Sequence, residues 1–345
     1  MKYTTLPHTD IKVSKLCLGT MTWGNQNTQE DGFQQMDYAV EQGINFFDTA
    51  EMYPVPAQAE TYAETERIIG KWLKKTGKRS DIVLGSKIAG PGDYTAHVRT
   101  NGFAPEAIED AIEHSLKRLQ TDYLDLFQLH WPERESNFFG TRDYKHNPED
   151  AWTDNFNDVL NSLYKAIQAG KIRNIGISNE KAWGAMRYLE ESKYNGMPRV
   201  KTIQNAYSLI NRGFESDLAE ISMREGLGLL AYSPMAFGVL SGKYVEGLAD
   251  ENSRLNLYPR FARYSSVNCT KATTQYLKIA QDNGLSLAQM SLAFVTQQPF
   301  VTSNIIGASK LDQLKENIES IHVDLSDEII AEINKVHEEI PNPAT

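Results

Sequence analysis

The chain has 345 residues, which is enough for two average domains or for one barrel of about 250 residues with additional loops. Hydrophobic residues make up 41% and charged residues 23%, a globular balance that excludes a disordered or fibrous chain. The net charge is −10, from 35 basic and 45 acidic residues, which argues against a general nucleic-acid-binding or anionic-membrane-binding surface.

Cysteine usage and the N-terminus indicate the compartment. Cys17 and Cys269 lie far apart and are too few for a disulfide framework, which favours a reducing environment. The first residues contain no apolar segment of a signal peptide, and no run approaches 18 apolar residues. We therefore expect a cytoplasmic protein with neither a membrane nor a nucleic acid as its partner.

Eight short apolar runs predict strands of a parallel sheet, because strands covered on both faces are apolar throughout. In chain order they are residues 16–19, 44–48, 82–87, 124–130, 175–178, 202–205, 229–233 and 304–307. Amphipathic repeats of three or four residues lie between them and predict helices at 31–40, 66–73, 104–120, 156–167, 182–189, 218–223 and 276–279. The alternation predicts either a (β/α)8 barrel or a doubly wound sheet.

The remaining segments are predicted as additions to this repeat. Residues 1–15 are expected to form a hairpin that closes the bottom of a barrel. Long loops are expected at 131–152 and 244–268. Ser326 and the acidic residues after it are typical of a helix start, which predicts an extra helix over 326–337. No linker divides the chain, so we expect a single domain over residues 1–345.

Polar residues at the ends of the predicted strands favour the barrel. The first strand is not followed by the G-x-G-x-x-G pattern of dinucleotide-binding doubly wound folds. The polar residues are Asp48, Lys87, His130, Ser178, Gln204 and Ser233, each at or next to the C-terminal end of a different strand. In a closed barrel these positions ring one mouth, where active sites of barrel enzymes are built.

Four of the residues at this mouth are typical of a proton donor to a carbonyl group. Tyr53 follows Asp48 by five residues, and a phenol is normally a weak acid at pH 7. The ammonium of Lys87 is expected to lower the pKa of the phenol, while Asp48 orients the ammonium and His130 hydrogen-bonds a substrate oxygen. Taken singly, each residue has another explanation: a helix cap for Asp48, a solvated lysine and a packed loop histidine.

Motifs along almost the whole chain carry a family resemblance. They include Gly19-Thr20-Met21, Asp48-Thr49-Ala50-Glu51-Met52-Tyr53, Leu129-His130, Gly176-Ile177-Ser178-Asn179, Tyr232-Ser233-Pro234-Met235 and Leu240-Ser241-Gly242-Lys243-Tyr244. With these motifs, residues 1–335 resemble the aldo-keto reductases, which are NADPH-dependent carbonyl reductases on a (β/α)8 barrel. Within that family the chain looks like the bacterial Tas-type members, near the potassium-channel β-subunit branch.

The resemblance implies a site for NADP(H) and a role for each catalytic residue. Tyr53 is implied as the general acid, tuned by Lys87 and Asp48, with His130 orienting the carbonyl group. Ser178, Asn179 and Gln204 are implied to hold the nicotinamide carboxamide, and Tyr232 to stack on its ring. The other implied cofactor residues are Gly19, Thr20, Met21, Asp48, Ser233, Pro234, Met235, Leu240, Gly242, Lys243, Arg254, Gly307, Ser309, Gln313, Glu316 and Asn317, the last five being assigned to the eighth loop.

Three functions compete at this stage. The leading prediction is an oxidoreductase that reduces a small carbonyl compound, with NADPH preferred over NADH. Its substrate pocket would include Trp23, Tyr53, His130 and Trp131, although both tryptophans could equally be structural. The alternative is a cofactor-sensing regulatory subunit that binds NADPH and a protein partner with little turnover. A metal-dependent hydrolase is disfavoured, because the seven histidines show no zinc-type spacing, and no metal is expected.

Overall fold

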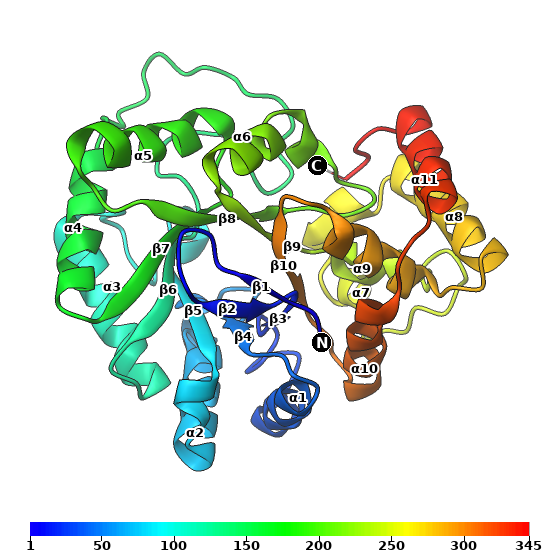
Figure 1. Ribbon diagram of the computed structural model, residues 1–345, viewed down its shortest axis with the longest axis horizontal. Coiled ribbons are helices and arrows are strands. Elements are labelled where there is room, and N and C mark those ends of the chain that lie inside the picture. The colour runs from blue at the N-terminus through cyan, green and yellow to red at the C-terminus, as the bar shows by residue number, and fades with distance from the viewer. Residues whose placement is uncertain (345) are drawn as a thin grey trace.

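Eight parallel strands close into a barrel in the computed structural model, which describes residues 1–344 (Figure 1). The strand order around the barrel is β10-β3-β4-β5-β6-β7-β8-β9. The strands are β3 (Leu16–Gly19), β4 (Phe46–Asp48), β5 (Val83–Ile88), β6 (Leu124–Leu129), β7 (Ile172–Ser178), β8 (Val200–Ala206), β9 (Gly228–Tyr232) and β10 (Val301–Ile306). The predicted (β/α)8 barrel is confirmed, and each predicted strand overlaps an observed one.

An N-terminal hairpin covers one end of the barrel, as predicted. Its strands β1 (Tyr3–Thr5) and β2 (Lys12–Ser14) are antiparallel. The Ser14 backbone N–H donates to Oδ1 of Asn45 (2.8 Å), and Lys15 Nζ donates to the Val301 carbonyl (2.9 Å). Asn45 and Val301 lie at the beginnings of β4 and β10, so the hairpin closes the N-terminal end and leaves the opposite mouth free.

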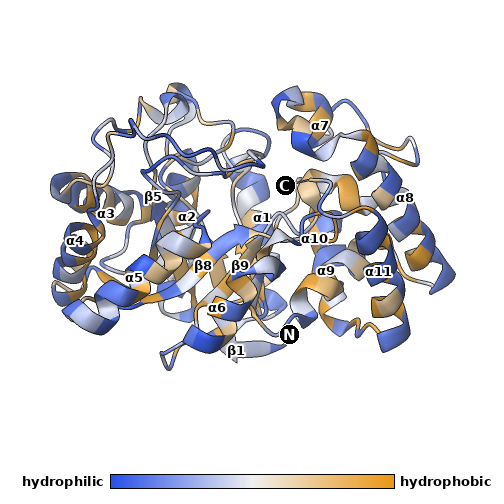
Figure 2. Cartoon of the chain, turned by 90° about the horizontal axis from the view of Figure 1, so that it is seen from above, coloured by the Kyte–Doolittle hydropathy of each residue, from blue (hydrophilic) through white to orange (hydrophobic). Residues whose placement is uncertain are grey.

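Eight helices surround the strands. They are α1 (Gln29–Glu41), α2 (Glu64–Thr76), α3 (Pro105–Leu119), α4 (Phe156–Gln168), α5 (Ala182–Asn195), α6 (Leu218–Glu225), α9 (Leu287–Gln297) and α10 (Leu311–Glu319). In α3 the buried residues Ile108, Ala111, Ile112 and Leu116 repeat every three or four positions, which is the pattern that predicted this helix. Figure 2 shows hydrophilic and hydrophobic residues alternating along the outer helices.

The sequence analysis is wrong at three helices. α8 (Val267–Asp282) begins nine residues before the predicted helix at 276. It packs against the C-terminal α11 (Asp327–Glu339), whose predicted N-cap Ser326 accepts a hydrogen bond from Ile329 N. α9 was not predicted because it is buried around most of its circumference, so its apolar residues do not mark one face. The predicted eighth loop ends early, and Gln313, Glu316 and Asn317 lie on α10.

Two long segments cover the open mouth of the barrel. Residues 130–155, after β6, contain neither helix nor strand, as predicted for 131–152. The segment after β9 is more structured than predicted, since it contains α7 (Arg254–Leu257) and a 3₁₀ turn at Pro259–Tyr264. Figure 2 shows α7 at the end of the molecule opposite β1.

Candidate active site

A buried ion pair lies at the ends of two neighbouring barrel strands. Lys87 Nζ is 2.7 Å from Oδ2 of Asp48 and also donates to the Thr49 carbonyl at 2.7 Å. The other carboxylate oxygen, Oδ1, accepts hydrogen bonds from Gln204 Nε2 (2.8 Å) and Gln128 Nε2 (3.2 Å). Every polar atom of the pair has a partner inside the barrel, so the ammonium group is held in one position.

Tyr53 and His130 meet at this ion pair. The Tyr53 hydroxyl lies 3.5 Å from Lys87 Nζ, and the Tyr53 side chain is almost fully buried. The His130 ring packs edge-on against the Tyr53 ring, with centroids 5.7 Å apart. The structure thus brings the four predicted catalytic residues together from β4, the loop after β4, β5 and the end of β6.

Burial and neighbouring charges determine the protonation states of Tyr53, Lys87 and His130. Burial raises the pKa of the Tyr53 phenol, and the nearby Lys87 ammonium only partly opposes this effect. Burial acts to lower the pKa of Lys87, but Asp48 and Tyr53 outweigh it and hold that pKa above the ordinary value. Burial, followed by the Lys87 charge, holds the pKa of His130 well below its usual range. The Lys87 charge thus acts to lower the pKa of Tyr53, as expected, but burial outweighs it, so at pH 7 these side chains are a neutral phenol, an ammonium and a neutral imidazole.

Because His130 is buried and neutral, we predict that the free energy of unfolding depends on pH. The pKa of His130 in the folded state lies well below its value of about 6.5 in the unfolded state. At a pH between these two pKa values, the unfolded state therefore binds one proton more than the folded state. The free energy of unfolding should fall as pH drops below about 6.5, by up to about 1.4 kcal/mol per pH unit from this group. Urea unfolding of the wild type and of His130→Asn between pH 5 and pH 8 measures this contribution. An identical pH slope in both proteins would contradict it.

A cavity of about 750 Å³ opens beside these residues at the barrel mouth. Tyr53, His130 and Asp48 line it, while Lys87 lies behind them. The predicted cofactor residues on its wall are Gly19, Thr20, Met21, Asp48, Ser178, Asn179, Gln204, Tyr232, Ser233, Pro234, Met235, Lys243, Arg254, Gly307, Ser309, Gln313, Glu316 and Asn317. Segments that are far apart in the sequence thus share one continuous cavity.

Four predicted contact residues do not lie on the cavity wall. Trp23 is fully buried, and its indole donates to Gln35 Oε1 at 3.3 Å. Trp131 is 1% exposed and donates to the Pro91 carbonyl, while the ring of Tyr94, which does line the cavity, stacks on it. For both tryptophans the structure favours the packing alternative.

The other two residues of this set follow β9. Leu240 is fully buried in the core. Gly242 occupies a turn with a φ of +86°. Neither residue is part of the cavity wall.

A hydrogen-bonded polar group lies along the side of the cavity formed by β7, β8 and β9. The Tyr232 hydroxyl donates to Asn179 Oδ1 (2.6 Å), and Asn179 Nδ2 donates to the His130 carbonyl (2.9 Å). Ser178 Oγ donates to the Gln204 carbonyl at 2.7 Å. Asn179 and Ser233, each just after a strand, have φ values of +53° and +52°, which non-glycine residues rarely adopt and which recur at functional sites.

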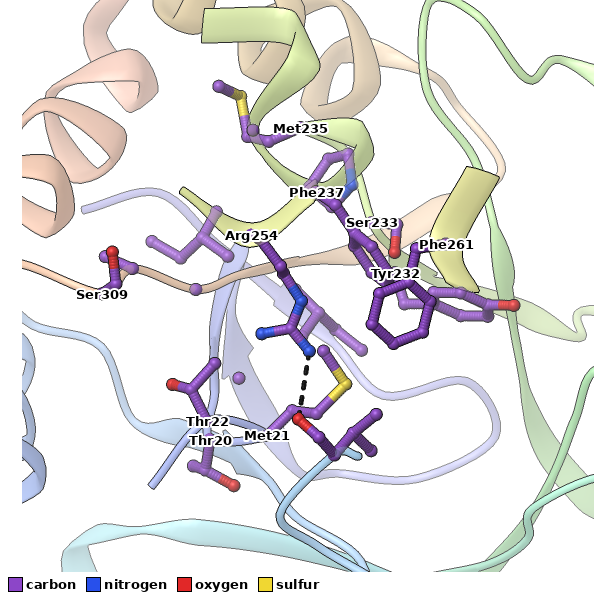
Figure 3. A pocket seen from close by; sticks show the side chains of 18 of the residues that line it. Thr20, Met21, Thr22, Tyr232, Ser233, Met235, Phe237, Arg254, Phe261 and Ser309 are labelled. Carbon is purple, nitrogen blue, oxygen red and sulfur yellow. Dashed lines mark hydrogen bonds between the residues drawn. The ribbon is translucent and has the colours of Figure 1, made fainter. Parts of the chain in front are cut away.

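The cavity wall is positively charged within an acidic protein. Four basic residues line it, Lys243, Arg254, Arg260 and Arg263, against the two acidic residues Asp48 and Glu316. Arg254 reaches into the cavity, as Figure 3 shows, where Nη2 donates to the Val55 carbonyl at 3.3 Å. Its buried Nε has no hydrogen-bond partner among residues 1–344, and burial lowers the pKa of its guanidinium to about 10. A buried cation without an acidic partner marks this wall as a site for an anion.

The sequence analysis missed several residues of the wall. Phe237, Arg260, Phe261 and Arg263 all line the cavity. The guanidinium of Arg254 lies 4.8 Å from the centroid of the Phe237 ring. The interleaved string Pro259-Arg260-Phe261-Ala262-Arg263 is the signal that could have identified the last three, because basic and aromatic residues together are typical of anion recognition.

Comparison with known proteins identifies the family. The model described as "Aldo/keto reductase family" matches residues 15–338. The chain is 48% identical to Protein tas of Escherichia coli, with 100% of both chains covered. It is 30% identical to norsolorinic acid reductase stcV of Emericella nidulans, covering 95% of this chain and 79% of the relative. It is also 31% identical to a probable voltage-gated potassium channel subunit beta of Oryza sativa, covering 99% and 98%.

The chain belongs to the aldo/keto reductase family, so the predicted resemblance is confirmed. Family membership and the reductase among its relatives support an oxidoreductase role. Over residues 1–344, no helix is both long and apolar enough to cross a membrane. Within the same range, no three His, Cys, Asp or Glu side chains gather into a group that could hold a metal ion.

Proposed function

We propose that the protein reduces an aldehyde or ketone to an alcohol with NADPH. The observation that carries this proposal is the Tyr53 hydroxyl at the wall of the cavity, held beside the Lys87 ammonium and the neutral His130 ring. These residues form a proton donor in a buried site, next to a wall that carries excess positive charge. Aldo/keto reductases use nicotinamide cofactors, and this wall supports the phosphorylated form.

The residues present fit such a cofactor. A dinucleotide with a 2′-phosphate carries several negative charges, and the buried Nε of Arg254 is a donor without a partner. Lys243 adds a second cation to the same wall. Between Ser233 and Gly238, the backbone adopts positive φ at Ser233, Ala236, Phe237 and Gly238, and successive turns of this kind expose N–H groups to anions. Ser178, Asn179 and Gln204 supply polar side chains for the carboxamide, and Tyr232 supplies a flat ring.

When bound, the reduced nicotinamide would supply a hydride to the carbonyl carbon. Tyr53 donates its hydroxyl proton to the carbonyl oxygen, which becomes the alcohol oxygen. The phenolate that remains is stabilised by Lys87, whose charge favours that form, and Asp48 keeps the ammonium in place. His130 is neutral and lies against the Tyr53 ring, so it orients the oxygen by hydrogen bonding without adding a charge.

The affinities for NADPH and NADH test whether the basic residues of the cavity wall bind the cofactor phosphates. NADPH should bind more tightly than NADH, and Arg254→Gln should weaken NADPH binding by about 10-fold or more, since a charged hydrogen bond to phosphate is lost. Higher salt should weaken NADPH binding in the wild type. Fluorescence titration of the wild type and variant with both cofactors measures these effects. Equal affinity for NADPH and NADH, or no effect of salt, would contradict the assignment.

A further inference from the structure

A second cavity adjoins the candidate active site. Its volume is about 930 Å³, and it lies between the long segment after β6 and the beginnings of α5 and α6. The two cavities have five lining residues in common: Phe139, Gly140, Asn179, Tyr232 and Arg263. A compound whose carbonyl group lies at Tyr53 therefore has room to extend past these residues, which we call the junction.

Arg263 is the charged residue of the junction. Its guanidinium lies 4.8 Å from the centroid of the Tyr264 ring and 5.8 Å from that of Phe237. Stacking on aromatic rings orients a guanidinium. The Tyr232 and Tyr264 hydroxyls also interact with Arg263, which occupies part of its five N–H donors and leaves the others for an anion. No carboxylate of residues 1–344 forms an ion pair with Arg263 within 4.0 Å. This half-buried cation is therefore oriented but not neutralised.

The second cavity also contains cations without an acidic partner. Lys181 and Arg142 line it, and neither forms an ion pair with a carboxylate in the part of the chain that the structure describes. Two of the acidic residues on its wall are occupied by backbone groups. Asp217 accepts from Leu218 N at 2.6 Å, and Asp150 accepts from Trp152 N at 3.0 Å. The wall carries four basic residues, Arg134, Arg142, Lys181 and Arg263, against three acidic ones, Glu135, Asp150 and Asp217, so a small excess of positive charge faces a ligand.

The position of Arg263 separates it from the basic residues assigned to the cofactor. Lys243 and Arg254 line only the first cavity, whereas Arg263 lines both. We propose that the junction recognises a carboxylate on the substrate, and that Arg263 is the residue that determines this specificity. The substrate class is then a carbonyl compound that also carries an acid group. A planar guanidinium pairs with a planar carboxylate through two parallel hydrogen bonds, which favours this anion. The inference rests on the proposed reductase function.

Matched substrates test the proposal. The probes are 4-carboxybenzaldehyde and its neutral counterpart, methyl 4-formylbenzoate, with NADPH oxidation as the measurement. The wild type should prefer the acid. Arg263→Gln should lower kcat/KM for the acid by about 10-fold, mainly through KM, because a charge-assisted hydrogen bond is lost. For the ester, kcat/KM should stay within about twofold, and Arg263→Lys should restore part of the preference because it keeps the charge.

Arg224→Gln is the matched control, because Arg224 is an exposed arginine of α6 that pairs with Glu220. It removes the same charge at a residue that lines neither cavity and should leave the preference for the acid unchanged. Equal losses for the acid and the ester in Arg263→Gln would overturn the proposal, since they would indicate a structural role.

A binding measurement separates this proposal from the reductase function. Calorimetry with 4-(hydroxymethyl)benzoate should show binding to the wild type and about 10-fold weaker binding to Arg263→Gln. Unchanged binding in the variant would overturn the role of Arg263. If the wild type reduced neither aldehyde but bound this carboxylate through Arg263, the reductase function would fail while the recognition of a carboxylate would be supported.

Discussion

Tyr53→Phe should lower kcat for carbonyl reduction by about 10²–10⁴-fold, the usual contribution of a positioned general acid. The substitution removes one hydroxyl group and keeps the buried ring that packs against His130. NADPH affinity and the thermal midpoint should therefore change little. Steady-state reduction of an aldehyde, NADPH titration and thermal unfolding together measure the three quantities.

The control is Tyr194→Phe, which removes a hydroxyl from a tyrosine that is 69% exposed. Its kcat should equal that of the wild type. Retained turnover in Tyr53→Phe would refute the assigned acid. Tight NADPH binding with negligible turnover of a broad carbonyl panel by the wild type would instead favour the regulatory-subunit alternative.

Lys87→Met should impair both stability and activity. The variant keeps a long apolar side chain but leaves the Asp48 carboxylate buried without its ammonium partner. Breaking a buried ion pair in this way costs about 3–5 kcal/mol of the free energy of unfolding. Activity should also fall, because the phenolate of Tyr53 loses the charge that stabilises it. Urea unfolding and steady-state kinetics at pH 7 measure the two effects.

The double variant Asp48→Asn, Lys87→Met provides the decisive comparison. Removal of both charges should recover part of the lost stability, because no unpaired charge then remains in the barrel. Activity should remain low. Additive stability losses in the double variant would contradict the coupling.

The ion pair also has a pH range. The pKa of Lys87 is raised in the folded state, so the contribution of Lys87 to stability is complete below about pH 10.5 and is lost only as pH rises through that raised pKa.

Local patterns in the sequence were sufficient to locate the barrel repeat and to bring the candidate catalytic residues to one mouth. Strands buried on both faces are continuous apolar runs, so all eight could be located from residues such as Ile203 and Leu229 without knowledge of their neighbours. The chemistry-bearing residues follow those strands directly. Asp48, Lys87 and His130 could therefore be assigned to one mouth as soon as a closed barrel was inferred. α9 was missed because burial on most sides leaves no one-sided pattern.

Properties that depend on contacts between distant segments emerged only in the folded chain. The pKa of Tyr53 reflects a balance between burial and the Lys87 charge, and the extent of burial depends on all elements around the mouth. The sequence predicts Trp23 and Trp131 in the substrate pocket. In the folded chain both side chains are buried in packing contacts and do not line the cavity. The role proposed for Arg263 depends on the meeting of two cavities. Residue type and spacing therefore predicted the barrel repeat and the candidate reacting groups, whereas burial and the proximity of remote segments decided their protonation states and the shape and charge of the site.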